Sequence, residues 1–222
     1  MKNIKAIIFD AYGTLFDVNS AAEKCKDKIG DKWEGFANYW RTTQLEYTWL
    51  RSLMKRHKDF WKVTEDSLDK SIKTFNIEPS MRNELLNLYK ILSPFKEVPE
   101  VLKSLKEKKF KLAILSNGTP SLLEELVKSN SLDNVFDDLF SIEEVGIFKP
   151  DSKVYDIPIK KYQIQKNEIA FLSANTWDVS GGGNYGYNSI WVNRSNNIFD
   201  NLDFKPKYEI KNLKELLEII QS

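Results

Sequence analysis

Short, unbroken runs of apolar residues recur along the chain and define its predicted strands. They are IKAIIFD (4–10), FKLAILSN (110–117), EIAFLSA (168–174) and SIWVN (189–193), with a weaker run in LFSIEEVG (139–146). A run of this length without polar alternation is typical of a strand buried on both faces of a parallel sheet. We therefore expect these segments to form the strands of one buried sheet.

Segments with apolar residues at helical spacing lie between these runs. PEVLKSLKEKK begins with Pro99, and TPSLLEELVKS offers Thr119 as a helix N-cap, followed by Pro120 at the first helical position. NLKELLEII near the end of the chain carries its apolar residues on one helical face. Strand and helix alternate over residues 99–222. This alternation predicts an α/β fold with a doubly wound, parallel-sheet (Rossmann-like) core.

Residues 17 to about 97 break this alternation, because no convincing strand occurs there. The stretch DKWEGFANYWRTTQLEYTWLRSLMKRH reads as one long helical segment crowded with aromatic residues, and further helical patterns follow it. Breaks near Asp17 and at Pro94 and Pro99 delimit this part of the chain. We predict an all-helical cap subdomain over residues 17–97, inserted into a core domain made of residues 1–16 and 98–222.

Composition and charge narrow the class of protein. Hydrophobic residues make up 41% of the 222 residues, which is ordinary for a globular protein. Lys and Arg number 33 against 32 Asp and Glu, which excludes a globally basic nucleic-acid binder. No apolar run approaches the roughly eighteen residues of a membrane-spanning helix. From the charge balance and the missing apolar run we expect neither a nucleic-acid nor a membrane partner. Because Cys25 is the single cysteine, we expect no intrachain disulfide and a cytoplasmic location.

The single histidine, His57, restricts the chemistry further. It lies in the charged run MKRHKDF and is expected on a solvent-exposed surface. One histidine excludes a multi-histidine metal site. If the chain is an enzyme, its catalysis therefore depends on carboxylates, lysine and hydroxyl groups.

Polar side chains follow the predicted strands at their carboxyl ends. In open parallel α/β sheets, ligands bind in the crevice beyond these ends. The sequence thus brings an acid, hydroxyls, amides and a lysine to one place from separate segments. The residues concerned are Asp10, Ser116, Asn117, Lys149, Ser173, Asn175 and Asp178.

Four motifs resemble those of the haloacid dehalogenase superfamily, in the same order and at similar spacing. FDAYGTLFD is similar to its first motif, LSNG to its second, KPD to its lysine motif and FLSANTWD to its last acidic motif. The resemblance covers the whole chain, and the predicted helical insertion lies where that superfamily carries a cap. It implies that Asp10 is a nucleophile.

Two positions distinguish the classes of this superfamily. Its phosphatases carry a second Asp two residues after the nucleophile, where this chain has Tyr12, and the backbone carbonyl there helps to hold magnesium. They also place several acids after the third strand, where this chain has one, Asp178. Mg²⁺ prefers an octahedral shell of oxygen ligands. WRTTQLEYTWLRSLM and SANTWDVSG instead resemble the L-2-haloacid dehalogenases, which implies that no metal and no cofactor are needed.

The resemblance assigns the first chemical step to residues at the strand ends. Asp10 attacks the carbon next to the substrate carboxylate, on the face opposite the halogen. Lys149 compensates the charge of Asp10, and Thr14 orients it. Ser116 and the backbone N–H groups that follow Asp10, from Ala11 onward, hold the substrate carboxylate.

A departing halide needs hydrogen-bond donors where its charge develops. The resemblance places Arg41, from the cap, and Asn117, from the core, in this role. The guanidinium group of Arg41 suits it because it stays charged and presents several donors. The apolar part of the substrate is expected to lie in a pocket formed by Tyr12, Leu45, Phe60 and Trp177.

The second step hydrolyses the ester on Asp10. Asp178 is the expected general base for the attacking water, and Ser173 and Asn175 shape the water site. Lys149 anchors Asp178, and Tyr155 forms a hydrogen bond near the lysine.

The predicted reaction is hydrolytic dehalogenation of short-chain (S)-2-haloacids to (R)-2-hydroxy acids and halide, through an aspartyl ester and with inversion at carbon. The resemblance also implies a homodimer. Two alternatives remain: a phosphatase of the same superfamily acting on a small phosphate ester, and a non-catalytic binding protein. Tyr12 argues against the first. The retained charges of Asp10, Arg41, Lys149 and Asp178 argue against the second, because buried charges are costly unless they are paired or used.

Three features depart from the dehalogenase pattern. Thr42 replaces a common glutamine and leaves the substrate range open. Pro158 lies inside a helix expected after Lys149 and should kink or shorten it. The glycine-rich stretch SGGGNYGYN is expected to form a loop.

Overall fold

The computed structural model describes residue 1 and residues 3–220, and a six-stranded parallel sheet forms its centre. The strand order is β3-β2-β1-β4-β5-β6. Phe9 at the end of β1 pairs with Ile114 of β2 and with Leu172 of β4, so the carboxyl ends of these strands lie together. The strands are β1 (Ala6–Phe9), β2 (Lys111–Ser116), β3 (Asp138–Ser141), β4 (Ile169–Ser173), β5 (Asn188–Val192) and β6 (Tyr208–Ile210).

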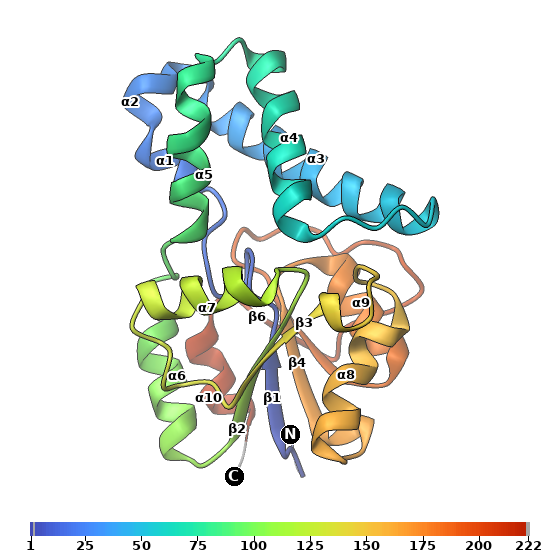
Figure 1. Cartoon of the computed structure of the whole chain (residues 1–222). Helices are drawn as coiled ribbons and strands as arrows, with labels where there is room; N and C mark the ends of the chain where they lie inside the picture. Colours follow the sequence, from blue (N-terminus) through green and yellow to red (C-terminus); the bar gives the residue numbers. More distant parts are fainter. Residues whose placement is uncertain (2, 221–222) are drawn as a thin grey trace.

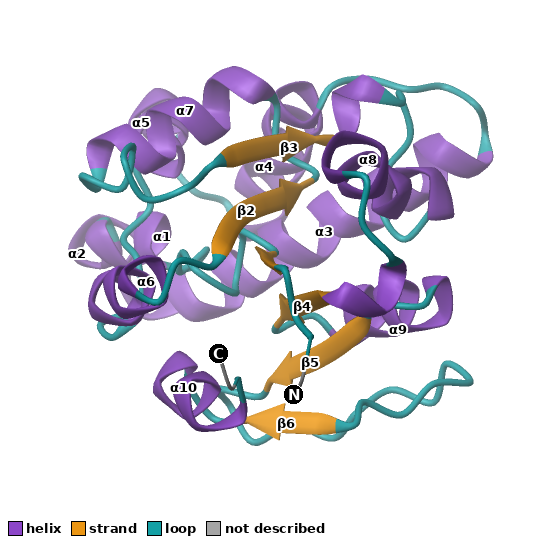
Figure 2. Ribbon diagram, turned by 90° about the horizontal axis from the view of Figure 1, so that it is seen from below, coloured by secondary structure: helices purple, strands orange, loops and turns teal. Residues whose placement is uncertain are grey.

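Helices cover both faces of the sheet, which confirms the doubly wound α/β fold (Figures 1 and 2). One face carries α6 (Val98–Glu107), α7 (Pro120–Ser129) and α10 (Leu216–Ile219). The other carries α8 (Ser152–Tyr162) and α9 (Thr176–Tyr185). The predicted N-cap is confirmed, because the Leu122 backbone N–H donates to Thr119 Oγ1 at 3.3 Å. The edge strand β6 was not predicted, since its three residues form no apolar run.

Helices also fill the stretch between β1 and α6, and they lie above the carboxyl ends of the strands (Figure 1). Two short segments connect this helical layer to the sheet and run side by side. The Asp17 N–H donates to the Ser93 carbonyl at 2.8 Å, and the Phe95 N–H donates to the Leu15 carbonyl at 3.0 Å. The helices are α1 (Ser20–Lys24), α2 (Lys26–Ile29), α3 (Trp33–Leu53), α4 (Phe60–Phe75) and α5 (Arg82–Lys90).

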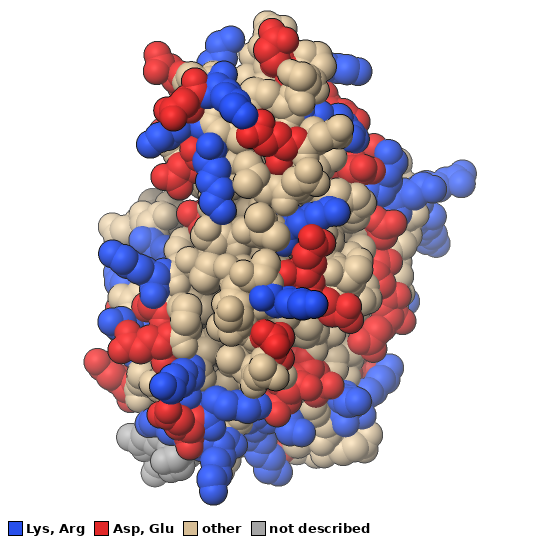
Figure 3. Space-filling model, turned by 60° about the vertical axis from the view of Figure 1, so that its left-hand side comes forward, with Lys and Arg blue, Asp and Glu red and all other residues tan. Residues whose placement is uncertain are grey.

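Short 3₁₀ turns complete the chain, and none of its described helices is both long and apolar enough to cross a membrane. On the face drawn in Figure 3, basic and acidic side chains intermingle around an uncharged central area, so this face presents no continuous basic surface. The 3₁₀ turns are η1 (Gly30–Lys32), η2 (Pro79–Met81), η3 (Ile142–Glu144), η4 (Lys166–Glu168) and η5 (Leu213–Glu215).

Residues 180–185 of the glycine-rich stretch belong to α9, so the prediction of a loop was wrong for this part. A Cβ atom on Gly181 would lie 2.5 Å from the Tyr155 hydroxyl oxygen and 2.7 Å from Pro150 Cβ. A Cβ atom on Gly182 would lie 2.7 Å from the Phe171 ring. Glycine weakens a helix by about 1 kcal/mol relative to alanine, but here it lets α9 approach α8 and β4 closely.

Pro158 does not shorten its helix, because α8 continues to Tyr162. Pro158 is buried together with Val154, Tyr155 and Ile157 on one face of α8. Packing of a buried apolar face supplies most of the stability of a helix in a protein. This packing compensates for the backbone hydrogen bond that proline cannot make.

His57 is half-buried against Glu143 and Phe148, so the expectation of a solvent-exposed histidine was wrong. It lies between α3 and α4, with its side chain 29% exposed. Its Nε2 atom lies 2.9 Å from Glu143 Oε2, and its ring centroid lies 5.1 Å from that of Phe148. The loop between α3 and α4, which carries His57, therefore joins the helical layer to the segment that leads into Lys149.

Candidate active site

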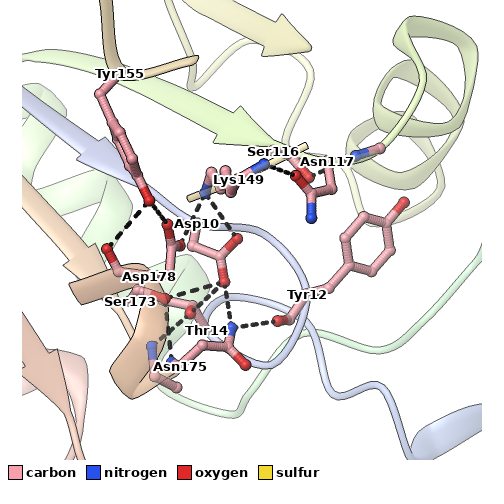
Figure 4. Close-up of polar contacts among 12 residues, drawn as sticks. Asp10, Tyr12, Thr14, Ser116, Asn117, Lys149, Tyr155, Ser173, Asn175 and Asp178 are labelled. Carbon is pink, nitrogen blue, oxygen red and sulfur yellow. Dashed lines mark hydrogen bonds and ion pairs between the residues drawn. The ribbon is translucent and has the colours of Figure 1, made fainter. Parts of the chain in front are cut away.

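The carboxyl ends of β1, β2 and β4 bring the predicted polar residues together beneath the helical layer (Figures 1 and 4). Asp10 directly follows β1, Ser116 ends β2 and Ser173 ends β4. Asn175 occupies the N-cap position of α9, which places Asp178 in the first turn of that helix. One connected group of side chains results, although its members come from distant parts of the chain.

The two carboxylate oxygens of Asp10 have unequal surroundings (Figure 4). Oδ2 accepts hydrogen bonds from Thr14 Oγ1 at 2.9 Å, Asn175 Nδ2 at 2.9 Å and Ser173 Oγ at 3.3 Å. Oδ1 accepts from Lys149 Nζ at 3.2 Å. Asp10 as a whole is 5% exposed. Three donors therefore fix Oδ2, whereas Oδ1 is the oxygen with room for a further partner.

Lys149 lies between two buried carboxylates. Its Nζ atom is 3.2 Å from Asp10 Oδ1 and 2.9 Å from Asp178 Oδ2. Burial alone would lower the pKa of Lys149, but Asp178 and Asp10 together raise it. The ammonium group thus stays charged and compensates both acids.

Asp178 is buried and its acidity is weakened. Burial, with repulsion from Asp10, raises the pKa of Asp178 to about 6 against the opposing attraction of Lys149. The Tyr155 hydroxyl donates to Asp178 Oδ1 at 2.7 Å. Burial and the Asp178 carboxylate raise the pKa of Tyr155 well above its usual value, so the tyrosine remains a donor. A carboxylate with this pKa can accept a proton near neutral pH.

The turn after Asp10 leaves backbone donors available. The N–H groups of Thr14, Leu15 and Phe16 all donate to the Ala11 carbonyl. Over the described residues, the N–H groups of Ala11 and Tyr12 themselves find no acceptor. Unpaired N–H groups beside a carboxylate suit the binding of an anionic group of a ligand.

The end of β2 contributes Ser116 and Asn117. Asn117 Oδ1 accepts the Lys149 backbone N–H at 3.1 Å, which fixes the orientation of the amide group. In Figure 4 its amide nitrogen points toward the region between Asp10 and the Tyr12 ring. Ser116 Oγ accepts the Gly118 N–H at 3.0 Å. Both side chains are buried, so donors of the second strand border the same site.

Arg41 enters the site from α3 in the helical layer. Its Nη2 atom donates to the Tyr12 carbonyl at 3.3 Å, and its Nη1 atom donates to Gln44 Oε1 at 2.9 Å. The same Tyr12 carbonyl accepts from Asn175 Nδ2 at 3.3 Å. Arg41 is therefore connected through one carbonyl to the amide that holds Asp10.

Aromatic rings form the apolar side of the site. The Tyr12 ring centroid lies 5.2 Å from that of Phe60 and 5.7 Å from that of Tyr89, with which it stacks at 17°. Two of the predicted pocket residues, Leu45 and Trp177, are not part of this ring cluster. Trp177 packs edge-to-face against Trp49 at 5.5 Å, and Leu45 is half-buried on α3, one turn after Arg41. Tyr12 and Phe60 are thus the predicted aromatic residues that meet beside Asp10.

Three residues with contacts to the site were not predicted from the sequence. Gln44 and Tyr89 contact Arg41 or Tyr12. Arg194 Nη2 donates to the Thr14 carbonyl at 2.9 Å, and its other terminal nitrogen lies 2.5 Å from Glu97 Oε1. The spacing of three residues from Arg41 is the sequence signal that could have indicated Gln44.

Comparison with known proteins gives a consistent result. Residues 4–186 match the model of the haloacid dehalogenase-like hydrolase family. The chain is 39% identical to an (S)-2-haloacid dehalogenase of Pseudomonas fluorescens over 218 residues, or 97% of this chain and 96% of that protein.

Comparison with solved structures also identifies dehalogenases. The fold is similar to a dehalogenase solved with an intermediate complex (TM-score 0.97, 34% identity, 100% of this chain and 99% of the other). It is also similar to the L-2-haloacid dehalogenase from Xanthobacter autotrophicus with chloropropionic acid covalently bound (TM-score 0.88, 32% identity, 97% and 98% of the two chains).

Proposed function

Because the chain belongs to the haloacid dehalogenase-like hydrolase family, we propose that it is a hydrolytic (S)-2-haloacid dehalogenase. It converts short-chain (S)-2-haloacids to (R)-2-hydroxy acids and halide, through an ester on Asp10 and with inversion at carbon. The names of its relatives and the geometry around Asp10 support this proposal.

In the first step, Asp10 Oδ1 attacks the carbon that carries the halogen, and the carbon–halogen bond breaks. Oδ1 is suited to attack because the other carboxylate oxygen, Oδ2, accepts the three hydrogen bonds that fix the side chain. The N–H groups of Ala11 and Tyr12, with the Ser116 hydroxyl, bind the substrate carboxylate. The N–H donors of Arg41 and Asn117 stabilise the departing halide as its charge develops.

In the second step, Asp178 takes a proton from a water molecule that attacks the ester carbonyl. Its raised pKa supports this role, because a base works best when its pKa lies near the working pH. Lys149 and Tyr155 orient Asp178, while Ser173 and Asn175 position the water. The bond between the acyl carbon and the ester oxygen then breaks, and the departing oxygen takes the proton from Asp178. The hydroxy acid leaves, and loss of the remaining acid proton restores the Asp10 carboxylate.

The apolar pocket limits the substrate to a short chain. Tyr12 and Phe60 line it closest to Asp10, with their ring centroids 5.2 Å apart. The substrate range beyond a short alkyl group depends on these two rings and on Thr42.

One observation favours a dehalogenase over a phosphatase of the same family. Asn175 Nδ2 donates to both Asp10 Oδ2 and the Tyr12 carbonyl oxygen. A magnesium ion would need those two oxygens as ligands, but here a hydrogen-bond donor bridges them. Among the described residues, no three His, Cys, Asp or Glu side chains are grouped to hold a metal ion. The residues therefore do not fit Mg²⁺, and a magnesium-dependent phosphatase is the poorer candidate.

A non-catalytic binding protein is the weaker alternative. Lys149 and Asp178 have fully buried side chains, and Asp10 is nearly so. Burying three charges is costly, and a binding surface elsewhere would not need them.

The direct test is halide release from L-2-chloropropionate, measured beside the D-enantiomer and a phosphate ester, with and without EDTA. We expect halide from the L-substrate alone, D-lactate as the organic product, and no effect of the chelator. Phosphate release that requires magnesium would instead identify a phosphatase. No turnover of either compound would favour the binding protein.

We also propose that residues 17–97 act as a cap over a core made of residues 1–16 and 98–222, that the protein is a cytoplasmic homodimer, and that it needs no cofactor. The exposed apolar side chains of Leu50, Leu53 and Met54, at the end of α3, support self-association. The unpaired Cys25 supports a reducing compartment. Sedimentation of the purified protein tests the dimer.

A further inference from the structure

We infer that Gln44 is a positioning residue, which aims the guanidinium group of Arg41 at the leaving halide. The inference rests on the proposed dehalogenase function and adds a residue to it. Gln44 is 1% exposed and lies on α3, one turn after Arg41. No hydrogen bond joins Gln44 to Asp10, so its effect on the reaction passes through Arg41.

The orientation of the Gln44 amide follows from its neighbours. Thr64 Oγ1 donates its one proton to the Phe60 carbonyl at 2.8 Å, so it can only accept from Gln44. Gln44 Nε2 accordingly donates to Thr64 Oγ1 at 2.7 Å. The amide oxygen then faces the other way, where it accepts from Arg41 Nη1 at 2.9 Å.

Tyr89 supports the same arrangement from α5. Its hydroxyl oxygen lies 3.0 Å from Gln44 Nε2 and 3.2 Å from Gln44 Oε1. The Tyr89 ring stacks on Tyr12, so the residue connects the amide to the turn after Asp10. Burial raises the pKa of Tyr89, which keeps the hydroxyl protonated.

Two anchors then determine how Arg41 lies. The Gln44 oxygen holds Nη1 and the Tyr12 carbonyl holds Nη2. A guanidinium group is planar and has five N–H bonds, of which these anchors use two. One N–H on each terminal nitrogen and the Nε–H remain for an anion. Because both ends of the plane are held, the direction of these donors is fixed before the substrate binds.

A fixed donor matters most where charge develops in the transition state. Gln44 should therefore affect the departure of halide and leave the later hydrolysis of the ester unchanged. Chloride leaves less readily than bromide and needs more assistance. Loss of the Gln44 anchor should accordingly slow 2-chloro substrates more than 2-bromo substrates.

The test compares wild type, Gln44→Met, Arg41→Lys and the double variant. Gln44→Met keeps the length of the side chain but removes the acceptor. Single-turnover formation of the Asp10 ester is followed by the mass of the peptide that contains Asp10. We expect Gln44→Met to slow this step about tenfold or more with L-2-chloropropionate. The loss should be smaller with L-2-bromopropionate, with KM and ester hydrolysis little changed.

The double variant separates positioning from a structural role. If Gln44 acts through Arg41, adding Gln44→Met to Arg41→Lys should cost less than about threefold, because effects on one shared interaction are not additive. Tyr89→Phe is a milder variant that should move the chloride-to-bromide rate ratio in the same direction. Ser71→Ala, which removes a buried hydroxyl from α4 away from this network, is the matched control and should leave the ratio unchanged.

Equal losses with both halogens, or a full loss that persists in the Arg41→Lys background, would overturn the positioning role. That result leaves the proposed function intact, because the wild type still releases halide. A wild type that releases no halide from any 2-haloacid overturns both.

Discussion

At the scale of single residues, the two oxygens of Asp10 are the most informative atoms. Thr14, Ser173 and Asn175 direct three donors to Oδ2, and Lys149 directs one to Oδ1. A carboxylate held in this way keeps one oxygen fixed as an anchor and presents the other to the substrate. The proposed covalent mechanism depends on this division.

The covalent step predicts where the oxygen of water goes. In a single turnover in ¹⁸O-labelled water, with enzyme in excess, the peptide containing Asp10 should gain the label and the hydroxy acid should not. The reason is that water attacks the ester carbonyl, so the product hydroxyl comes from the former carboxylate oxygen. Mass spectrometry of both species measures this. Label in the product with Asp10 unlabelled would mean that Asp10 acts as a general base.

Asp178 sets the pH dependence. Its pKa is raised to about 6, and only its ionised form accepts a proton from water, so ester hydrolysis should slow as the pH falls through about 6. The Asp10 ester should then accumulate at acidic pH, where it is detectable by mass. Asp178→Asn is the control and should trap the ester at all pH values. A hydrolysis rate that stays flat between about pH 5 and about pH 8 would remove Asp178 from this role.

At the scale of secondary-structure elements, the distance between two helices sets the position of Tyr155. Helix α9 comes close to α8 because Gly181 has no side chain. Tyr155, on α8, can therefore donate to Asp178, on α9. A loop in place of α9 could not hold these two side chains at this spacing.

Gly181→Ala should consequently impair catalysis. The added Cβ atom would lie 2.5 Å from the Tyr155 hydroxyl oxygen, so the tyrosine or the helix has to move. We expect turnover to fall at least about tenfold and the free energy of unfolding to drop by about 1–3 kcal/mol. Kinetics and thermal melting measure the two effects. Gly35→Ala in α3, far from Asp178, is the matched control, and equal behaviour of the two variants would contradict the argument.

At the scale of the whole molecule, side chains from several elements join the helical layer to the segments that follow the strands. Arg41 reaches the Tyr12 carbonyl, Trp49 packs on Trp177, and His57 pairs with Glu143. The attachment of the helical layer therefore depends in part on these residues.

His57→Ala should loosen this attachment. It removes the contact with Glu143 at 2.9 Å and the ring contact with Phe148. A partly exposed pair contributes up to about 1 kcal/mol, so the thermal midpoint should fall by about 2–4 °C in a protein of this size. Lys28→Ala is the control, because the Lys28–Glu84 pair is exposed and lies within the helical layer. An unchanged midpoint for His57→Ala would show that this contact does not hold the layer.

The sequence by itself determined the features that depend on neighbouring residues. Unbroken apolar runs located five of the six strands, because a strand buried on both faces needs apolar side chains throughout. Thr119 and Pro120 located the start of α7. The polar residues at the strand ends located the candidate site, since parallel strands bring their carboxyl ends to one edge.

Only the tertiary structure decided the features that depend on contacts between distant residues. Gln44 and Tyr89 are 45 positions apart, and Arg194 and Thr14 are 180 apart, so no local pattern indicates either contact. The glycines of α9 predicted a loop, because glycine has a low intrinsic helix propensity. Close packing against Tyr155 and Phe171 reversed that preference, since a residue with any side chain would not fit.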